Sequence, residues 1–131
     1  MEYRGIERRG CTRFSIPGAT VRYKQKIHLF SKEEYIEEDY PVLNISRGGI
    51  LFLSQDRIDI ASKINLKIFI PDEQDALIIM GRVRWVLHNP GVSYKYQIGI
   101  QFNPYGKKKG HNSPELLEKI IALEKKHIKS G

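Results

Sequence analysis

The feature that most constrains the fold of this chain is the alternation of apolar and polar residues with a period of two. Successive side chains of a β-strand point to opposite faces, so this alternation is typical of strands with one buried and one solvated face. Six segments are predicted to be strands from this alternation or from short apolar runs: 19–29, 40–43, 49–53, 64–70, 83–87 and 94–102. Several such strands joined by short turns predict an all-β chain that forms an antiparallel barrel or sandwich.

The apolar residues of these segments predict which faces form the core. Residues 49–53 are expected to be more fully buried than the others, because they form a continuous apolar run. Val83, Trp85 and Leu87 are expected to share one face of their strand. Trp85 and the aromatic residues of 94–102 are assigned to the core, because alternating aromatic residues in a barrel usually pack inside. The alternative for these aromatic residues is a platform on which nucleic-acid bases stack.

One helix is predicted, over residues 113–129. Ser113 is a suitable N-cap, Pro114 suits the first helical position, and Glu115 complements the helix dipole. Apolar residues then recur at helical spacing and form a stripe, made of Leu116, Leu117, Ile120, Ile121 and Leu123. The stripe predicts that the helix packs on the barrel or on a partner.

Residues 1–16 differ from the rest of the chain because they are polar, contain four arginines and show no periodicity. We therefore expect them to form a flexible arm outside the core. Residues 17–131 are expected to contain the barrel and the helix. A chain of 131 residues has the length of one ordinary domain, so a single domain is predicted.

The chain carries a net charge of +7, from 22 Lys and Arg against 15 Asp and Glu. This balance indicates an anionic partner such as a phosphate compound, a nucleic acid or a membrane surface. Cys11 is the only cysteine, so no internal disulfide can form, as is typical of a reducing compartment. The sequence has no apolar signal core and no run approaching the roughly 20 apolar residues that span a bilayer. We expect a cytoplasmic protein without membrane insertion.

Sequence signals of catalysis and metal binding are absent. The histidines are scattered, and no Cys or His pair has the spacing of metal ligands. No nucleophile elbow, Walker loop or dinucleotide-binding fingerprint occurs. The lysine-rich segment 106–110 has the wrong form for a phosphate-binding loop and is predicted to be a solvated loop before the helix. We therefore expect a protein that is not an enzyme and that holds neither a metal nor a cofactor.

Two short motifs carry the functional interpretation. The first is R-R-x-x-x-R at residues 8–13, on the arm, and the second is N-x-S-x-x-G at residues 44–49, between two predicted strands. In this order and strand context they resemble the PilZ domain family, which is defined by R-R-x-x-x-R followed by D/N-x-S-x-x-G. The segments 81–85 and 99–102 and the C-terminal helix also look like the family. The resemblance implies a six-stranded antiparallel β-barrel with a C-terminal helix.

The resemblance also implies a receptor for cyclic di-GMP, a dianion with two guanines. Its ligand-binding residues here are expected to be Arg8, Arg9, Arg13, Asn44, Ser46, Gly48, Gly49 and Gly99. Arginine suits this ligand because a guanidinium grips phosphate oxygens in pairs, stacks on bases and donates to O6 and N7 of guanine. Asn44 stands where the family more often has Asp, and its amide can donate and accept at a guanine edge.

The family further implies how the signal is passed on. The ligand is expected to order the arm and close it on the barrel. An unknown protein effector then reads the new surface and controls motility, adhesion or polysaccharide output. Arg8 adds a third guanidinium, and in the family an arginine at this position goes with two stacked ligand molecules. Two molecules of cyclic di-GMP per chain are therefore expected.

Two functions of other classes are alternatives at this point. A nucleic-acid-binding barrel of the OB type fits the positive charge and the strand aromatics, although a nucleic-acid partner is not favoured. This alternative requires Tyr94 and Tyr96 to be exposed. A flavin-binding split-barrel enzyme is supported only by the barrel pattern.

Overall fold

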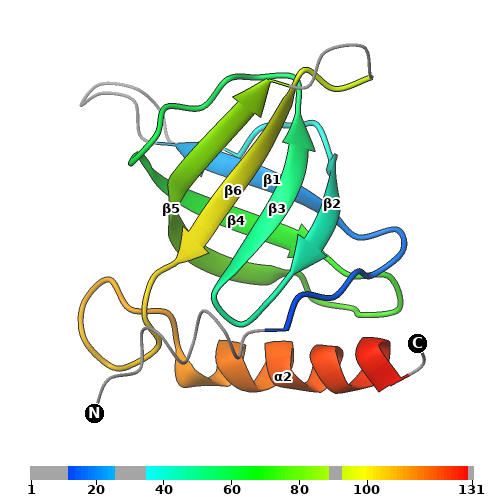
Figure 1. Ribbon diagram of the computed structural model, residues 1–131. Helices are drawn as coiled ribbons and strands as arrows, with labels where there is room; N and C mark the ends of the chain where they lie inside the picture. The colour runs from blue at the N-terminus through cyan, green and yellow to red at the C-terminus, as the bar shows by residue number, and fades with distance from the viewer. Residues whose placement is uncertain (1–11, 26–34, 89–92, 130–131) are drawn as a thin grey trace.

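A computed structural model describes residues 12–25, 35–88 and 93–129 of the chain. Its six strands are β1 (Thr20–Gln25), β2 (Tyr40–Ile45), β3 (Gly49–Ser54), β4 (Lys63–Phe69), β5 (Leu77–His88) and β6 (Tyr96–Phe102). They form a closed barrel in the order β1-β2-β3-β6-β5-β4, and every neighbouring pair is antiparallel (Figure 1). The predicted six-stranded antiparallel barrel is confirmed.

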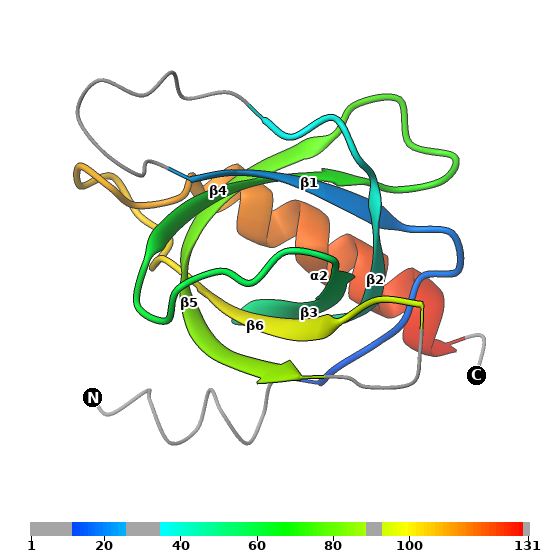
Figure 2. The ribbon, with the colours of Figure 1, turned by 90° about the horizontal axis from the view of Figure 1, so that it is seen from above.

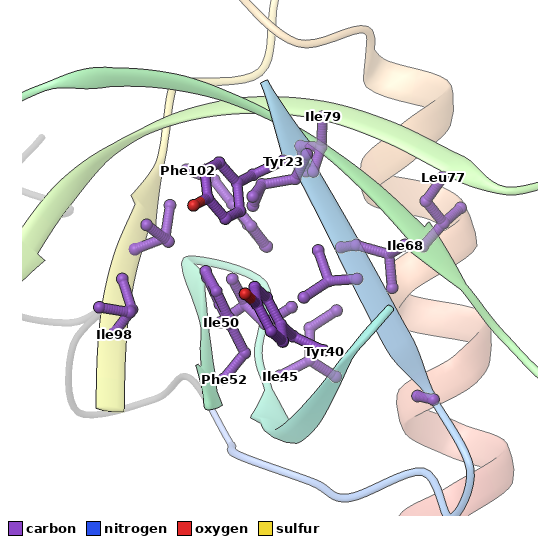
Figure 3. Close-up of a cluster of buried hydrophobic side chains, with 14 of the residues drawn as sticks. Tyr23, Tyr40, Ile45, Ile50, Phe52, Ile68, Leu77, Ile79, Ile98 and Phe102 are labelled. Carbon is purple, nitrogen blue, oxygen red and sulfur yellow. The ribbon is translucent and has the colours of Figure 1, made fainter. Parts of the chain in front are cut away.

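The core fills the inside of the barrel, as the alternation predicts. Along β4, Ile64, Leu66 and Ile68 are buried, and the residues between them are not. Figure 3 shows Phe52, Ile98 and other side chains from several strands pointing toward one another inside the barrel. Burying apolar surface contributes about 25 cal/mol per Å², so this inward face is the main source of stability.

Two details of the predicted core are wrong. β5 has a bulge between Val83 and Trp85, opposite β6. A bulge inserts one extra residue and reverses the alternation beyond it. Val83 is therefore buried, whereas Trp85 is only half-buried and Leu87 is 55% exposed. Residues 49–53 are not fully buried, because Leu51 lies on the outer face of β3.

The helix α2 (Pro114–Lys129) lies across one end of the barrel (Figure 1), and Figure 2 shows it behind the ring of strands. The backbone N–H of Leu116 donates to the Ser113 side-chain oxygen at 3.4 Å, so Ser113 is the N-cap as predicted. Ile120 and Leu123 are buried in the core cluster. The apolar stripe therefore packs on the chain's own barrel.

The segment that enters β1 belongs partly to the core. Phe14 and Ile16 are buried at 5% and 4% exposure. Phe14 also pairs with Ile45 at the end of β2, and each backbone N–H donates to the other residue's carbonyl at 2.9 Å. The prediction that all of residues 1–16 lie outside the core is therefore wrong for Phe14 and Ile16. A polar sequence context hid these two isolated apolar residues, because too few strand residues surround them to show a period.

Two tyrosines of the core share one carboxylate. The hydroxyl groups of Tyr23 and Tyr40 donate to Oδ2 of Asp56 at 2.9 Å and 3.2 Å. Burial, and then the hydrogen bond to Asp56, raise the pKa of Tyr23 above its ordinary value, and burial also raises the pKa of Tyr40. The barrel therefore favours the neutral phenols.

We expect stability to fall in alkali for this reason. The folded-state pKa of each tyrosine lies above the unfolded value of about 10. Its contribution to the free energy of unfolding is therefore complete below about pH 10 and is lost as the pH rises further. Tyr23→Phe should lower the free energy of unfolding at pH 7 by about 1 kcal/mol and make the loss above pH 10 shallower. Urea unfolding at both pH values measures this. Tyr96→Phe is the control, and an equal alkaline loss in Tyr23→Phe and wild type would contradict the assignment.

Candidate ligand-binding site

The second motif forms the turn between β2 and β3. The backbone N–H of Ser46 donates to the Gly49 carbonyl at 2.8 Å, which closes the turn. The Ser46 side-chain oxygen accepts from the backbone N–H of Gly48 at 3.2 Å. Ser46 is 9% exposed, and its hydroxyl oxygen stabilises the turn by accepting this hydrogen bond. The hydroxyl proton is not used in that bond, so it can be donated to a ligand.

Gly49 is required by the packing of β3 on β6. A Cβ atom at this position would lie 2.2 Å from the carbonyl oxygen of Ile100, a backbone atom that cannot move independently. The turn is further held on β6 because Phe102 donates its backbone N–H to the Gly48 carbonyl at 2.9 Å. The last glycine of the motif therefore has a structural role in joining the two strands.

One row of outward-facing residues crosses four strands. The strand register pairs Asn44 with Leu51, Leu51 with Gly99, and Gly99 with Trp85. A Cβ atom at Gly99 would lie 2.3 Å from Cε2 of Trp85, so the indole packs directly on this glycine. Gly99 is buried beneath it. Molecules approaching this row meet the half-buried indole of Trp85 before Gly99.

The arm is brought to the turn by the pairing of Phe14 with Ile45. Continuing this antiparallel register by one residue places Arg13 across from Ser46. Arg13 is exposed. Within the described residues, neither the guanidinium of Arg13 nor the side-chain amide of Asn44 has a hydrogen-bond partner. Both side chains are therefore available to a ligand on the outside of the barrel.

Six of the eight predicted site residues are thus gathered on one side of the barrel. Arg8 and Arg9 lie outside the described residues. The other six come from the arm, the end of β2, the β2–β3 turn, the start of β3 and β6, namely Arg13, Asn44, Ser46, Gly48, Gly49 and Gly99. A guanidinium, an amide and a hydroxyl in this arrangement can bind an anion and a polar base edge.

Two residues of this region were not among the predicted site residues. Trp85 was assigned to the core because the local sequence gives no sign of the bulge in β5. That bulge turns the Trp85 side chain toward the outer face. Arg47, within the second motif, donates through two nitrogens to the Glu124 carboxylate on α2. Only the fold brings a turn residue and a helix residue 77 positions apart into contact.

The described residues include no group of three or more His, Cys, Asp or Glu placed to hold a metal ion. They also include no helix long and apolar enough to cross a membrane. Tyr94 and Tyr96 pack against the core. The exposed aromatic pair that an OB-type nucleic-acid site requires is therefore not present at these positions.

Comparison with known proteins gives one family and two solved structures. The family model described as PilZ domain matches residues 7–116. No curated protein matches the chain significantly. The fold is similar to the PilZ domain with c-di-GMP of YcgR from Escherichia coli, at 11% identity and a TM-score of 0.61, over 94% of this chain and 93% of that one.

The fold is also similar to the Bacillus subtilis inhibitor of motility, MotI/DgrA, at 22% identity and a TM-score of 0.55. That match covers 89% of this chain and 51% of the other, so the chain spans about half of MotI. At these identities the two structures support the fold. The family model, in contrast, covers most of the sequence and includes both motifs. The chain therefore belongs to the PilZ domain family.

Proposed function

We propose that this protein is a receptor for cyclic di-GMP that acts as an adaptor and not as an enzyme. The observation that carries the proposal is the pairing of Phe14 with Ile45, which brings Arg13, the last residue of the arginine motif, close to the β2–β3 turn. Family membership and the c-di-GMP named for the similar YcgR domain support the choice of ligand.

The chemistry of binding is divided between the two motifs. Arg9 and Arg13 hold the phosphates by charge-assisted, bidentate hydrogen bonds. The Asn44 amide donates and accepts at a guanine edge, and Ser46 donates its hydroxyl proton. The indole of Trp85, packed on Gly99 at the end of the same outer row, offers a surface on which a guanine stacks.

The arm passes the binding signal to a partner. When the ligand binds, residues 1–13 close on the barrel and form a new surface together with the ligand. A protein effector of motility, adhesion or polysaccharide production reads this surface, in the cytoplasm. Similarity to an inhibitor of motility supports the first of these outputs.

Calorimetric titration at one salt concentration tests the proposal. We expect cyclic di-GMP to bind much more tightly than cyclic di-AMP or GTP, because only its two guanines meet the arginine and amide donors together. We also expect two molecules per chain, since Arg8 supplies a third guanidinium for the four charges of a stacked pair.

The molar ratio must be referred to an independently measured active protein fraction. Equal, weak binding of all three nucleotides would reduce the site to general attraction of anions by a basic protein. A ratio of one would mean that Arg8 is only a solvated charge.

A further inference from the structure

A bidentate ion pair joins the second motif to the C-terminal helix. Nε of Arg47 donates to Oε1 of Glu124 at 3.0 Å, and Nη2 donates to Oε2 at 3.2 Å. Paired hydrogen bonds of this kind are the strongest and most directional that arginine makes with a carboxylate. Glu124 directly follows Leu123, which packs in the core. The ion pair therefore fastens the buried part of α2 to the β2–β3 turn.

A second contact holds the same turn. The hydroxyl of Tyr105 donates to the Arg47 carbonyl at 2.6 Å. Tyr105 lies in the connection between β6 and α2 and packs against the core. The backbone of Arg47 is thus fixed independently of its side chain, so the guanidinium can change partner without unfolding the turn.

The two partners of the ion pair are unequally exposed. The Arg47 side chain is 44% exposed, whereas that of Glu124 is only 15% exposed. Arg47 lies between Ser46 and Gly48 of the candidate site, two residues beyond Ile45, which pairs with Phe14 of the arm. Arg13 directly precedes Phe14, so a dianionic ligand held by Arg13 would lie close to the turn that carries Arg47.

We propose that Arg47 is a further ligand-binding residue, which exchanges the Glu124 carboxylate for a ligand phosphate and so loosens α2 when the site is filled. The inference rests on the proposed binding of cyclic di-GMP. A phosphodiester is an equivalent planar acceptor for the guanidinium fork. Glu124, left as a mostly buried carboxylate without its partner, then disfavours the docked position of the helix.

This exchange makes ligand binding and helix docking compete for one group. Coupling of this kind is reciprocal: whatever weakens the hold of Glu124 on Arg47 must strengthen ligand binding. The docked helix covers one end of the barrel through Ile120 and Leu123 (Figure 1), so its release presents apolar surface to an effector.

Four proteins test the exchange by calorimetry with cyclic di-GMP: Glu124→Gln, Arg47→Gln, the double variant and the control Glu118→Gln. Glu118 is exposed on the same helix. We expect Glu124→Gln to raise affinity about fivefold to tenfold and Arg47→Gln to lower it about tenfold. Glu124→Gln should have no effect in the Arg47→Gln background, and Glu118→Gln should bind as wild type does.

Hydrogen exchange of the α2 amides supplies a second readout. Ligand should speed exchange over residues 116–128 in the wild type and change it little in Arg47→Gln. If the ion pair only holds the helix, both single variants will lose thermal stability while keeping wild-type affinity, and the inference is overturned. Wild-type protein that does not bind cyclic di-GMP at all would overturn the proposed function itself.

Discussion

Replacing both Arg9 and Arg13 by alanine is expected to lower the affinity for cyclic di-GMP by about a hundredfold or more. Each substitution removes a charge-assisted contact worth roughly 1.5–3 kcal/mol, which corresponds to about tenfold or more in affinity. The two arginines are four positions apart, so they approach the ligand from different points of the arm. Calorimetry at constant salt measures the single and double variants.

Stability separates a loss of binding from a loss of fold in this experiment. Arg13 is exposed and makes no ion pair with the described residues, so its removal should leave the thermal transition unchanged. The control is Lys107→Ala with Lys108→Ala, which removes the same charge from an exposed loop. A similar loss of affinity in the control would show that the ligand responds only to net charge.

Gly49→Ala is expected to lower the free energy of unfolding by about 2–3 kcal/mol. The added methyl group would meet the Ile100 carbonyl oxygen at 2.2 Å. Because that oxygen belongs to the backbone of β6, relief requires the two strands to separate along the seam between β3 and β6. Chemical denaturation measures the change, and ligand affinity should fall with it because the seam carries the β2–β3 turn.

Gly99→Ala is the matched comparison. Its methyl group would also collide, but with the indole of Trp85, a half-buried side chain that can turn toward solvent. We expect a loss below about 1.5 kcal/mol, together with a red shift of the emission of the single tryptophan. If Gly49→Ala proves no more destabilising than Gly99→Ala, the close spacing of β3 and β6 at Gly49 is not rigid.

Local patterns in the sequence were enough to predict the regular elements. Period-two alternation and short apolar runs identified each strand in part, although the first residues of β5 (Leu77–His88) were not predicted, and cap chemistry with a helical stripe identified α2 from its first residue. These signals are local, because a strand or a helix end is decided by residues a few positions apart. The two motifs likewise predicted a site from the order in which they occur along the chain.

Other features depended on contacts between distant segments. The bulge in β5 turned Trp85 outward, because strand pairing and not alternation decides where an extra residue is accommodated. Phe14 joined the core through its pairing with Ile45, although its neighbours in sequence are polar.

The sequence by itself determined the barrel, the helix and the two motifs, since each depends on residue type at short spacing. Only the tertiary structure decided that the closing glycine of the second motif serves the contact of β3 with β6, and that Arg47 reaches Glu124. The physical reason is that steric exclusion and ion pairing act over a few ångströms in space. Closure of the barrel brings together residues that are tens of positions apart in the chain.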